Sequence, residues 1–252
     1  MSTLAALVLS DARFPGGGHA HSGGVEEAVA RGLVGDVDGL AAFLDGRLRT
    51  AGLVAASFAA AAALSASRGL VAPESGSPHP ASRGLVARES GSRCEQAFRT
   101  LDVELDARTP SPAQRAASRA QGRATLRAAR LAWPSPVLDA LCTVDPRPHH
   151  ALLVGAVVGV DGGTPAAAAQ CAGYLAVSGP ASAAIRLLGL DPFAVNAVVV
   201  RLGGVLRGVV DEAVAAASGA PSTLPAPGAP VLDLMAQAHV HHHREQVRLF
   251  AS

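Results

Sequence analysis

The feature that most constrains the fold is the spacing of apolar residues between Pro192 and Ala217. Val195, Val198 and Leu202 follow one another at steps of three and four residues, which places their side chains on one face of an α-helix. No alternation of strand and helix patterns appears along the chain. Aromatic residues make up only 3% of it, which is few for a β-sandwich. We therefore predict an all-α protein, folded as a single compact domain of about seven to ten helices.

Proline and glycine divide this helical pattern into segments. Asp36 or Asp38 can cap a long helix that runs toward Leu64. Pro134 and Pro136 are expected to stop the helix that precedes them. Together with residues 192–217, we expect helices over residues 4–13, from about 22 onward, from 36 or 38 toward 64, and over 94–108, 111–132, 149–160, 164–178 and about 181–190.

A recent duplication interrupts the helical domain. The segment ASRGLVAPESGS at residues 66–77 recurs as ASRGLVARESGS at residues 81–92. Two copies are too few for a repeat architecture, and Ser, Gly and Pro favour a surface loop. We predict a mobile, disordered insertion over residues 66–92 within a helical domain of residues 1–218. A Pro-rich tether (219–230) and a His-rich partner-binding tail (231–252) follow.

The charged residues exclude several classes of function. Lys and Arg number 21 against 20 Asp and Glu, for a formal net charge of +1. This balance provides no overall attraction to nucleic acid or to an anionic membrane. Every basic residue is arginine, so the chain can form neither a Schiff base nor a P-loop phosphate site of its own.

The cysteines and the apolar stretches indicate in which cellular compartment the protein resides. Cys94, Cys142 and Cys171 are far apart and form no CxxC pair, which leaves zinc-ribbon and thioredoxin-like sites without support. The N-terminus lacks the basic region of a signal peptide. The long uncharged stretches Thr50–Ser67 and Gly162–Ile185 are diluted by Ala, Gly, Ser or Pro, so we expect no membrane span. We predict a soluble, cytoplasmic protein.

Two histidine-rich segments are candidate metal sites. The glycine-rich loop at residues 13–24 contains the pair His19 and His21, and imidazole is a ligand for borderline metals. The tail contains four more histidines, which could bind Ni²⁺, Zn²⁺ or Cu²⁺. Both segments could equally be solvated polar chain. The candidate tail ligands are His239, His241, His242 and His243.

An arginine ladder lies on the helix predicted for residues 111–132. Its members are four residues apart, so they spread over about 120° of one helical face. This face is either a docking surface for an acidic partner or an ordinary solvent face. The ladder consists of Arg115, Arg119, Arg123 and Arg127.

Motifs for catalysis are missing. The chain has neither G-x-S-x-G nor H-E-x-x-H. Asp102, Glu104 and Asp106 alternate along a predicted helix, which we interpret as carboxylates scattered over its surface. We therefore expect no catalytic residue and no enzyme activity.

The glycine-rich loop and the last residues together resemble the UreF family of urease accessory proteins. The loop sequence LSDARFPGGGHAHSGGVE is similar to the family's N-terminal signature, and the ending Arg248–Ser252 (RLFAS) is similar to its terminal Arg-Leu-Phe-x-Ser. Internal segments at residues 115–123, 150–155 and 183–188 also resemble family segments. The likeness extends over nearly the whole chain in order, except for residues 66–92. The matching loop positions are Asp11, Pro15, Gly17, Ser22, Gly24 and Glu26.

This resemblance implies an all-helical, non-enzymatic scaffold that links UreD (also called UreH) to the GTPase UreG. Such a complex assists GTP-dependent nickel insertion into apo-urease, and the UreF-like subunit is usually a homodimer. It implies no tightly bound cofactor, with Ni²⁺ as a transient ligand at most. The residues that we expect to bind partners are Pro15, Gly17, Ser22, Gly24, Glu26, Arg115, Arg119, Arg123, Arg248, Leu249 and Phe250.

Two alternatives remain open from the sequence. The first is a direct nickel carrier that uses the two histidine-rich segments, and it predicts tight, stoichiometric Ni²⁺ binding by the isolated chain. The second is an arginine-dependent nucleic-acid binder, which predicts strongly salt-dependent affinity. The near-zero net charge argues against the second.

Overall fold

The structure is a computed structural model that describes residues 4–17, 21–70 and 80–242, with side chains described at all of these except 80–90 and 241–242. Within these residues the chain is helical and has no β-strand, which confirms the predicted all-α class. The elements are α1 (Leu4–Ser10), α2 (Val25–Ala30), α3 (Val37–Arg47), the π-helical turn η2 (Leu48–Gly52), α4 (Leu53–Leu70), α5 (Pro80–Ala107), α6 (Pro112–Ala132), α7 (Pro136–Val144), α8 (His150–Val160), α9 (Pro165–Leu188), α10 (Pro192–Arg201), α11 (Gly203–Ala216), the 3₁₀ turn η3 (Pro221–Thr223) and α12 (Pro230–His242).

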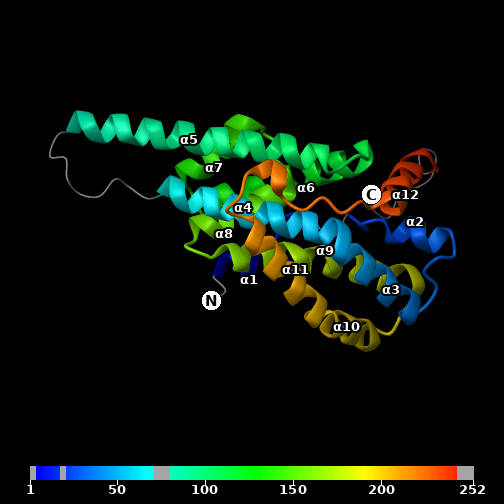
Figure 1. Cartoon of the computed structure of the whole chain (residues 1–252). Helices are drawn as coiled ribbons and strands as arrows, with labels where there is room; N and C mark the ends of the chain where they lie inside the picture. Colours follow the sequence, from blue (N-terminus) through cyan, green and yellow to red (C-terminus); the bar gives the residue numbers. More distant parts are fainter. Residues whose placement is uncertain (1–3, 18–20, 71–79, 243–252) are drawn as a thin grey trace.

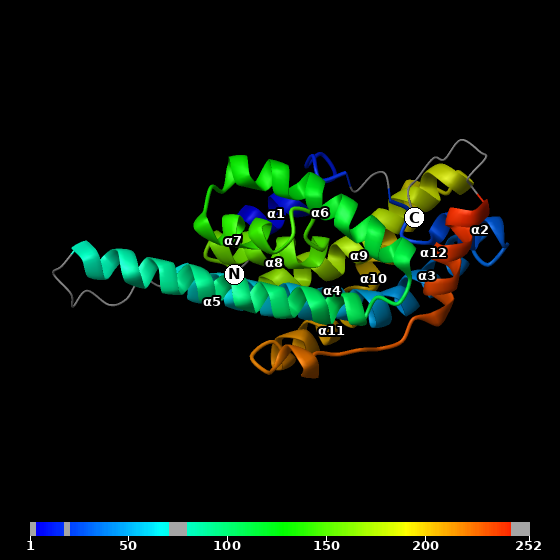
Figure 2. The same cartoon turned by 90° about the horizontal axis from the view of Figure 1, so that it is seen from above.

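Helices α4, α8 and α9 form the centre of the domain (Figure 1). Helix α5 packs along α4 and α7, and its N-terminal end extends beyond the body of the domain (Figures 1 and 2). Helices α12 and α2 lie together at the opposite end, where α12 also contacts α6. The last helix is thereby placed beside the helix that follows the glycine-rich loop.

The helix limits differ from the prediction in three places. The expected helix over 192–217 bends by 42° between α10 and α11, and α7 was not expected. For these reasons the described part of the chain has more helical segments than predicted. Conversely, α9 is continuous through Pro180, where the sequence predicted a break. Proline removes the hydrogen bond to the carbonyl four residues earlier, and the Ala176 carbonyl accepts one from Arg47 Nε instead, at 2.9 Å.

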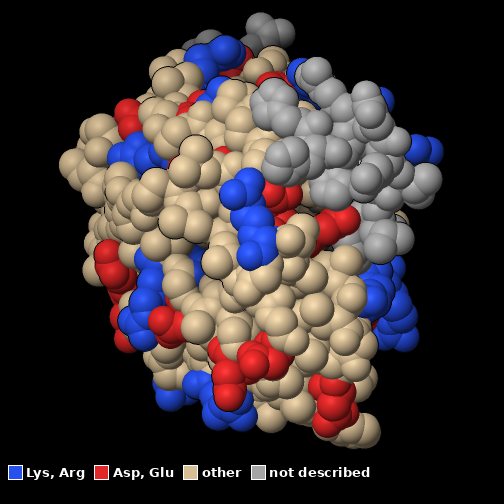
Figure 3. Space-filling view, turned by 90° about the vertical axis from the view of Figure 1, so that its right-hand side faces the viewer, with Lys and Arg blue, Asp and Glu red and all other residues tan. Residues whose placement is uncertain are grey.

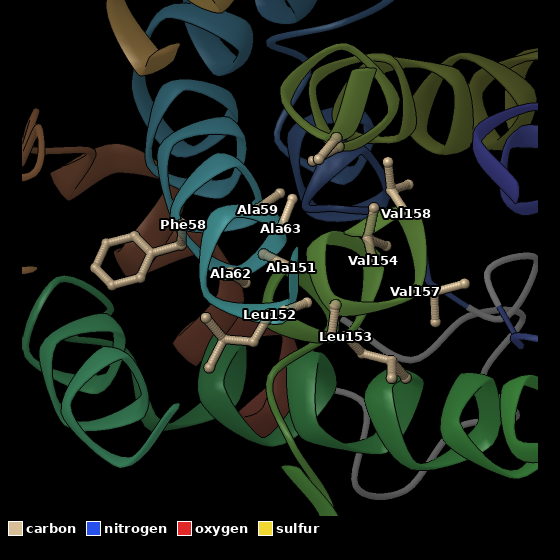
Figure 4. Packing of buried hydrophobic residues seen from close by; sticks show 14 of the residues in the cluster. Phe58, Ala59, Ala62, Ala63, Ala151, Leu152, Leu153, Val154, Val157 and Val158 are labelled. Carbon is tan, nitrogen blue, oxygen red and sulfur yellow. The ribbon is translucent and has the colours of Figure 1, made fainter. Parts of the chain in front are cut away.

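The crossing of α4 and α8 explains the abundance of alanine and glycine. A Cβ atom on Gly155 would come within 2.1 Å of the Ala59 carbonyl oxygen, and one on Gly159 within 2.6 Å of the Ala63 carbonyl oxygen. Only glycine allows so close an approach of two backbones. Figure 4 shows Ala59, Ala62 and Ala63 of α4 facing α8 near Val154, and all four side chains are fully buried. The small side chains therefore bring the two central helices into direct contact.

Two helical stretches, Val37–Leu70 and Pro165–Leu188, are long and apolar enough to cross a membrane by length and composition alone, and α10 with α11 would make a third if the bent pair counted as one. This differs from the expectation of no candidate span. In the structure, 67% of the first stretch's most apolar window is buried inside the domain, and 44% of the second's. Both stretches supply residues to the hydrophobic core.

The duplicated segment is partly helical, which corrects the predicted limits of the insertion. Helix α4 continues to Leu70, so it includes the first residues of copy one, and α5 begins at Pro80 and contains all of copy two. The second copy has Arg88 where the first has Pro73, so it can continue through a helix without a missing hydrogen bond. Residues 71–79 lie outside the described residues, and the mobility of the insertion stays a prediction.

The predicted tether is docked against the domain. Leu224 is buried, and Arg108 of α5 donates hydrogen bonds to the carbonyls of Ser222 and Leu224, at 2.9 and 3.2 Å. The chain then runs to α12, which forms the first half of the predicted tail. The helix is thus presented from an anchored segment.

Candidate functional site

The candidate site consists of two neighbouring cavities beside the glycine-rich loop. The larger has a volume of about 510 Å³ and lies among α3, α4, α5, α6, α8, α9 and α12. The smaller, of about 330 Å³, lies toward α1 and the outer part of α9. Six residues line both cavities and form what we call the shared wall: His21, Gly23, Arg47, Gln121, His150 and Leu175.

The glycine-rich loop reaches this wall because of its backbone conformation. Gly23 and Gly24 have φ angles of 61° and 93°, in the left-handed region that favours glycine. Gly24 caps α2, and Ser22 is buried. In the first half of the loop, Phe14 and Gly16 line the smaller cavity, whereas Pro15 is exposed and Gly17 faces α6. The predicted loop residues therefore divide between two surfaces.

Among the described residues, Arg47 is the only arginine of the shared wall. At the end of α3 it donates a hydrogen bond from Nη1 to the Gly23 carbonyl at 2.7 Å and from Nε to the Ala176 carbonyl at 2.9 Å. Among the described residues no carboxylate pairs with it. Burial lowers the pKa of its guanidinium to about 10. The side chain is still charged at neutral pH, so the wall carries a cation.

His150 faces the same cavities from the start of α8. Burial, and to a lesser extent the nearby His21, lowers the pKa of His150 to about 4. Its imidazole is therefore neutral at pH 7 and offers one N–H donor and one acceptor nitrogen. Together with the Gln121 amide, the wall provides neutral donors around the Arg47 charge.

A second polar cluster, the Arg119 network, lies next to this wall. Arg119 donates to carboxylate oxygens of Asp102, Asp106 and Asp145, each at 2.9 Å. Asp102 and Asp106 are four residues apart and share one face of α5. The prediction of scattered surface carboxylates is wrong for this pair, because the helical spacing brings them together.

His149 completes the Arg119 network. Its Nε2 lies 2.8 Å from Asp106 Oδ1, and its Nδ1 lies 3.0 Å from the Ser118 hydroxyl. The side chain is buried, and burial followed by the positive charge of Arg119 lowers the pKa of His149. Each polar atom of this imidazole has a partner, as buried polar groups require.

The arginine ladder divides into two halves. Arg115 donates to the carbonyls of Thr109 and Pro110, at 2.7 and 2.9 Å, and Arg119 belongs to its network. Arg123 and Arg127 are exposed. An acidic partner could reach the exposed half directly, but it would have to replace internal contacts of the other half. The partner-binding role of Arg115, Arg119 and Arg123 stays a prediction.

The predicted histidine ligands are only partly described. His239 is buried on α12, with Nε2 3.9 Å from Glu26 Oε2 on α2, and His21 lies in the shared wall. His241 and His242 end α12, and their side chains are not described. Within the described parts of the chain, no three His, Cys, Asp or Glu side chains are grouped as metal ligands. The remaining predicted residues, His19, His243, Arg248, Leu249 and Phe250, lie outside the described residues.

Sequence reasoning missed Arg47, Gln121 and His150. One signal could have found Arg47: it is a charged residue within the predicted apolar helix of residues 36–64. A charge at such a position needs a partner or a solvent-filled space. The double histidine at 149–150, after Pro148, was a weaker signal, because its two rings turn out to serve different clusters.

Comparisons with known proteins give consistent matches. A family model described as UreF matches residues 34–203. The urease accessory protein UreF of Mycolicibacterium vanbaalenii is 42% identical over the full length of both chains. Those of Mycobacterium marinum and Mycobacterium tuberculosis are 40% and 39% identical, also over both full lengths.

Proposed function

Because the chain belongs to the UreF family of urease accessory proteins, we propose that it acts as a urease maturation factor and non-enzymatic scaffold in the cytoplasm. In this role it links UreD/UreH to the GTPase UreG and assists GTP-dependent nickel insertion into apo-urease. The long sequence match supports the urease context. Binding of these partners and the lack of catalytic activity are parts of the proposal.

The observation that carries the scaffold role is the uncovered apolar edge of α12. Val231 and Leu234 are three residues apart on one side of the helix, and 58% and 71% of their surfaces are exposed. The opposite side buries Met235, Ala236 and His239 against the domain. The helix is thus held by one face and presents apolar side chains on the other.

A partner that covers this edge would gain binding free energy. Full burial of one large aliphatic side chain contributes about 1.5–3 kcal/mol. In Figure 3, which views the end that carries α12 and α2, charged side chains of both signs are scattered over a mostly uncharged surface. Such a face suits an apolar protein contact better than a strongly charged ligand. We assign it, with the tail that follows, to UreD/UreH.

A second apolar edge supports the homodimer. Phe193 and Val200 are seven residues apart on α10, two helical turns along the same side, and 86% of Phe193 is exposed. This edge lies away from α12 (Figure 1). Its separation from α12 would let one subunit bind a second copy of the chain and UreD/UreH at the same time.

Co-expression with UreD/UreH and UreG, followed by affinity capture and light scattering, tests the proposal. The intact chain should form a complex that contains all three proteins. Leu234→Asp should weaken capture of UreD/UreH at least tenfold, because it places a charge in the interface. The matched control is Leu131→Asp, which changes an 85% exposed leucine at the end of α6. Equal capture by both variants would contradict the assignment of α12.

Two further variants test the remaining surfaces. Deletion of residues 247–252 should abolish the binary complex with UreD/UreH and leave the helical circular dichroism unchanged. Phe193→Asp should convert the dimer to a monomer in light scattering. A chain that stays alone beside soluble UreD/UreH and UreG would refute the scaffold role. Nickel titration of the isolated chain would then test the carrier alternative.

A further inference from the structure

The shared wall contains a charge that the protein itself does not neutralise. Arg119 is paired with three carboxylates and Arg108 with Glu104. Arg47, in contrast, contacts two neutral carbonyls and no carboxylate among the described residues. An arginine side chain cannot lose its charge inside a protein. Arg47 is partly buried, a charge largely withdrawn from water without a counter-ion is costly, and a bound anion would reduce that cost.

The unused donors of Arg47 are available for such an anion. A guanidinium carries five N–H groups, and the two carbonyl contacts use one on Nε and one on Nη1. The contact with Ala176 compensates for Pro180 four residues later, so it fixes the side chain in place. The Nη2 group has no hydrogen-bond partner among the described residues and carries two N–H groups.

The surroundings of Arg47 also favour an anion. The other polar side chains of the shared wall are His21, Gln121 and His150, and none of them is acidic. Charged and titratable groups elsewhere around the two cavities are Arg108, His149 and Asp233 in the larger, and Asp11, Tyr174 and Arg186 in the smaller. Asp11 already forms an ion pair with Arg13. Cationic and neutral donors therefore dominate near the wall.

We propose that the shared wall binds a small oxyanion, held by the Arg47 guanidinium and by N–H groups of Gln121 and His150. The cavities of about 510 and 330 Å³ lie within or close to the usual size range of ligand sites. A guanidinium binds carboxylate and phosphate oxygens through paired N–H groups. The site is independent of the scaffold role, so either can fail without the other.

Histidine NMR on the full-length chain tests the site without altering it. Millimolar inorganic phosphate is added at constant ionic strength, with sodium chloride as the reference salt. Bound anion stabilises the protonated imidazole, so the pKa of His150 should rise from about 4 by about one unit. His150→Asn identifies the signal. Acetate, added in the same way, tests whether a carboxylate binds as phosphate does.

Arg47→Met and Arg123→Met form the matched pair of variants, since Arg123 is an exposed arginine of α6. Phosphate binding, measured by calorimetry, should be lost in the first and retained in the second. If Arg47→Met does not fold, Gln121→Leu replaces it and should weaken binding at least tenfold.

Three results would overturn the proposal. The first is a His150 pKa that does not respond to phosphate or acetate. The second is equal loss of binding in Arg47→Met and Arg123→Met, which would indicate surface attraction only. The third is phosphate binding that appears only after Glu245→Gln, a change in the tail beyond the described residues, because that result would mean that a carboxylate of the chain itself pairs with Arg47.

Discussion

The Arg119 network and the shared wall around Arg47 are neighbours with opposite designs. The two meet at consecutive residues, because His149 belongs to the network and His150 to the wall. Arg119 has three carboxylate partners, whereas Arg47 has backbone carbonyls as partners in the described part of the chain. In the network the arginine and the carboxylates neutralise one another, and their contacts join α5, α6 and the loop before α8. The wall leaves donors unused beside two cavities, as a binding site does.

The largest expected effect comes from breaking the network. Arg119→Met would leave Asp102, Asp106 and Asp145 close together without their shared cation. Removing one partner of a largely buried ionic cluster costs about 3–5 kcal/mol. Urea unfolding should show a loss near the lower limit, because Asp106 is partly exposed. A loss below that of Arg123→Met would contradict the structural role of the network.

The next largest effect is a loss of folding stability at low pH, which we attribute mainly to His150 of the shared wall. The pKa of His150 is about 4 in the folded chain, against 6.5 for a solvent-exposed imidazole. Above pH 6.5 the imidazole is neutral in the folded and in the unfolded chain, so its titration does not lower the stability of the fold. As pH falls below 6.5 the unfolded chain binds a proton that the fold does not, so stability decreases until about pH 4. The loss attributable to His150 at pH 5 is about 2 kcal/mol.

Urea unfolding at pH 7 and pH 5 checks this prediction. His150→Asn should show a smaller decrease between the two pH values than the unaltered chain. The buried His149 has a lowered pKa as well and contributes with the same sign, so part of the decrease should remain. An unchanged decrease in His150→Asn would show that His150 does not titrate as the structure indicates.

The smallest effect on stability is expected at Arg47. Arg47→Met removes two hydrogen bonds to carbonyls and also a charge without a carboxylate partner among the described residues. The lost hydrogen bonds cost about 1–3 kcal/mol together, and removal of the charge offsets part of this. We expect a net loss of about 1 kcal/mol in urea unfolding. A loss as large as that of Arg119→Met would mean that the two arginines have similar roles.

Local signals predicted much of the helical fold, because they act through neighbouring residues. Proline in the first turn and a polar cap before it mark the starts of α6, α9 and α10. The same signal, Ser135 followed by Pro136, starts α7, but the sequence reading took Pro136 only as the end of the preceding helix. Gly189 ends α9 in the left-handed conformation that glycine favours. Pro180 misled the sequence reading, because the group that satisfies the freed carbonyl, Arg47, is 129 residues away from Ala176.

The candidate site was less accessible to prediction than the fold. The glycine-rich loop was recognised from residue types, yet of the loop residues expected to bind partners only Gly24 lines a cavity, beside Gly23, while Phe14 and Gly16 line the smaller one. Arg119 was expected at a surface and proved to be the centre of a network. Arg47 was not singled out at all. Each of these outcomes depends on which helices lie side by side, and spacing along one helix does not contain that information.

By itself, the sequence determined the all-α class, most helix starts and ends, and the family, since periodicity, capping residues and motif order are local or linear properties. The tertiary structure alone decided which of the many arginines are neutralised. Coulombic pairing and burial depend on distances between α3, α5, α6 and α9. The close crossing of α4 and α8 at Gly155 sets the centre of that arrangement, and Arg119 and Arg47 owe their different roles to their places around it.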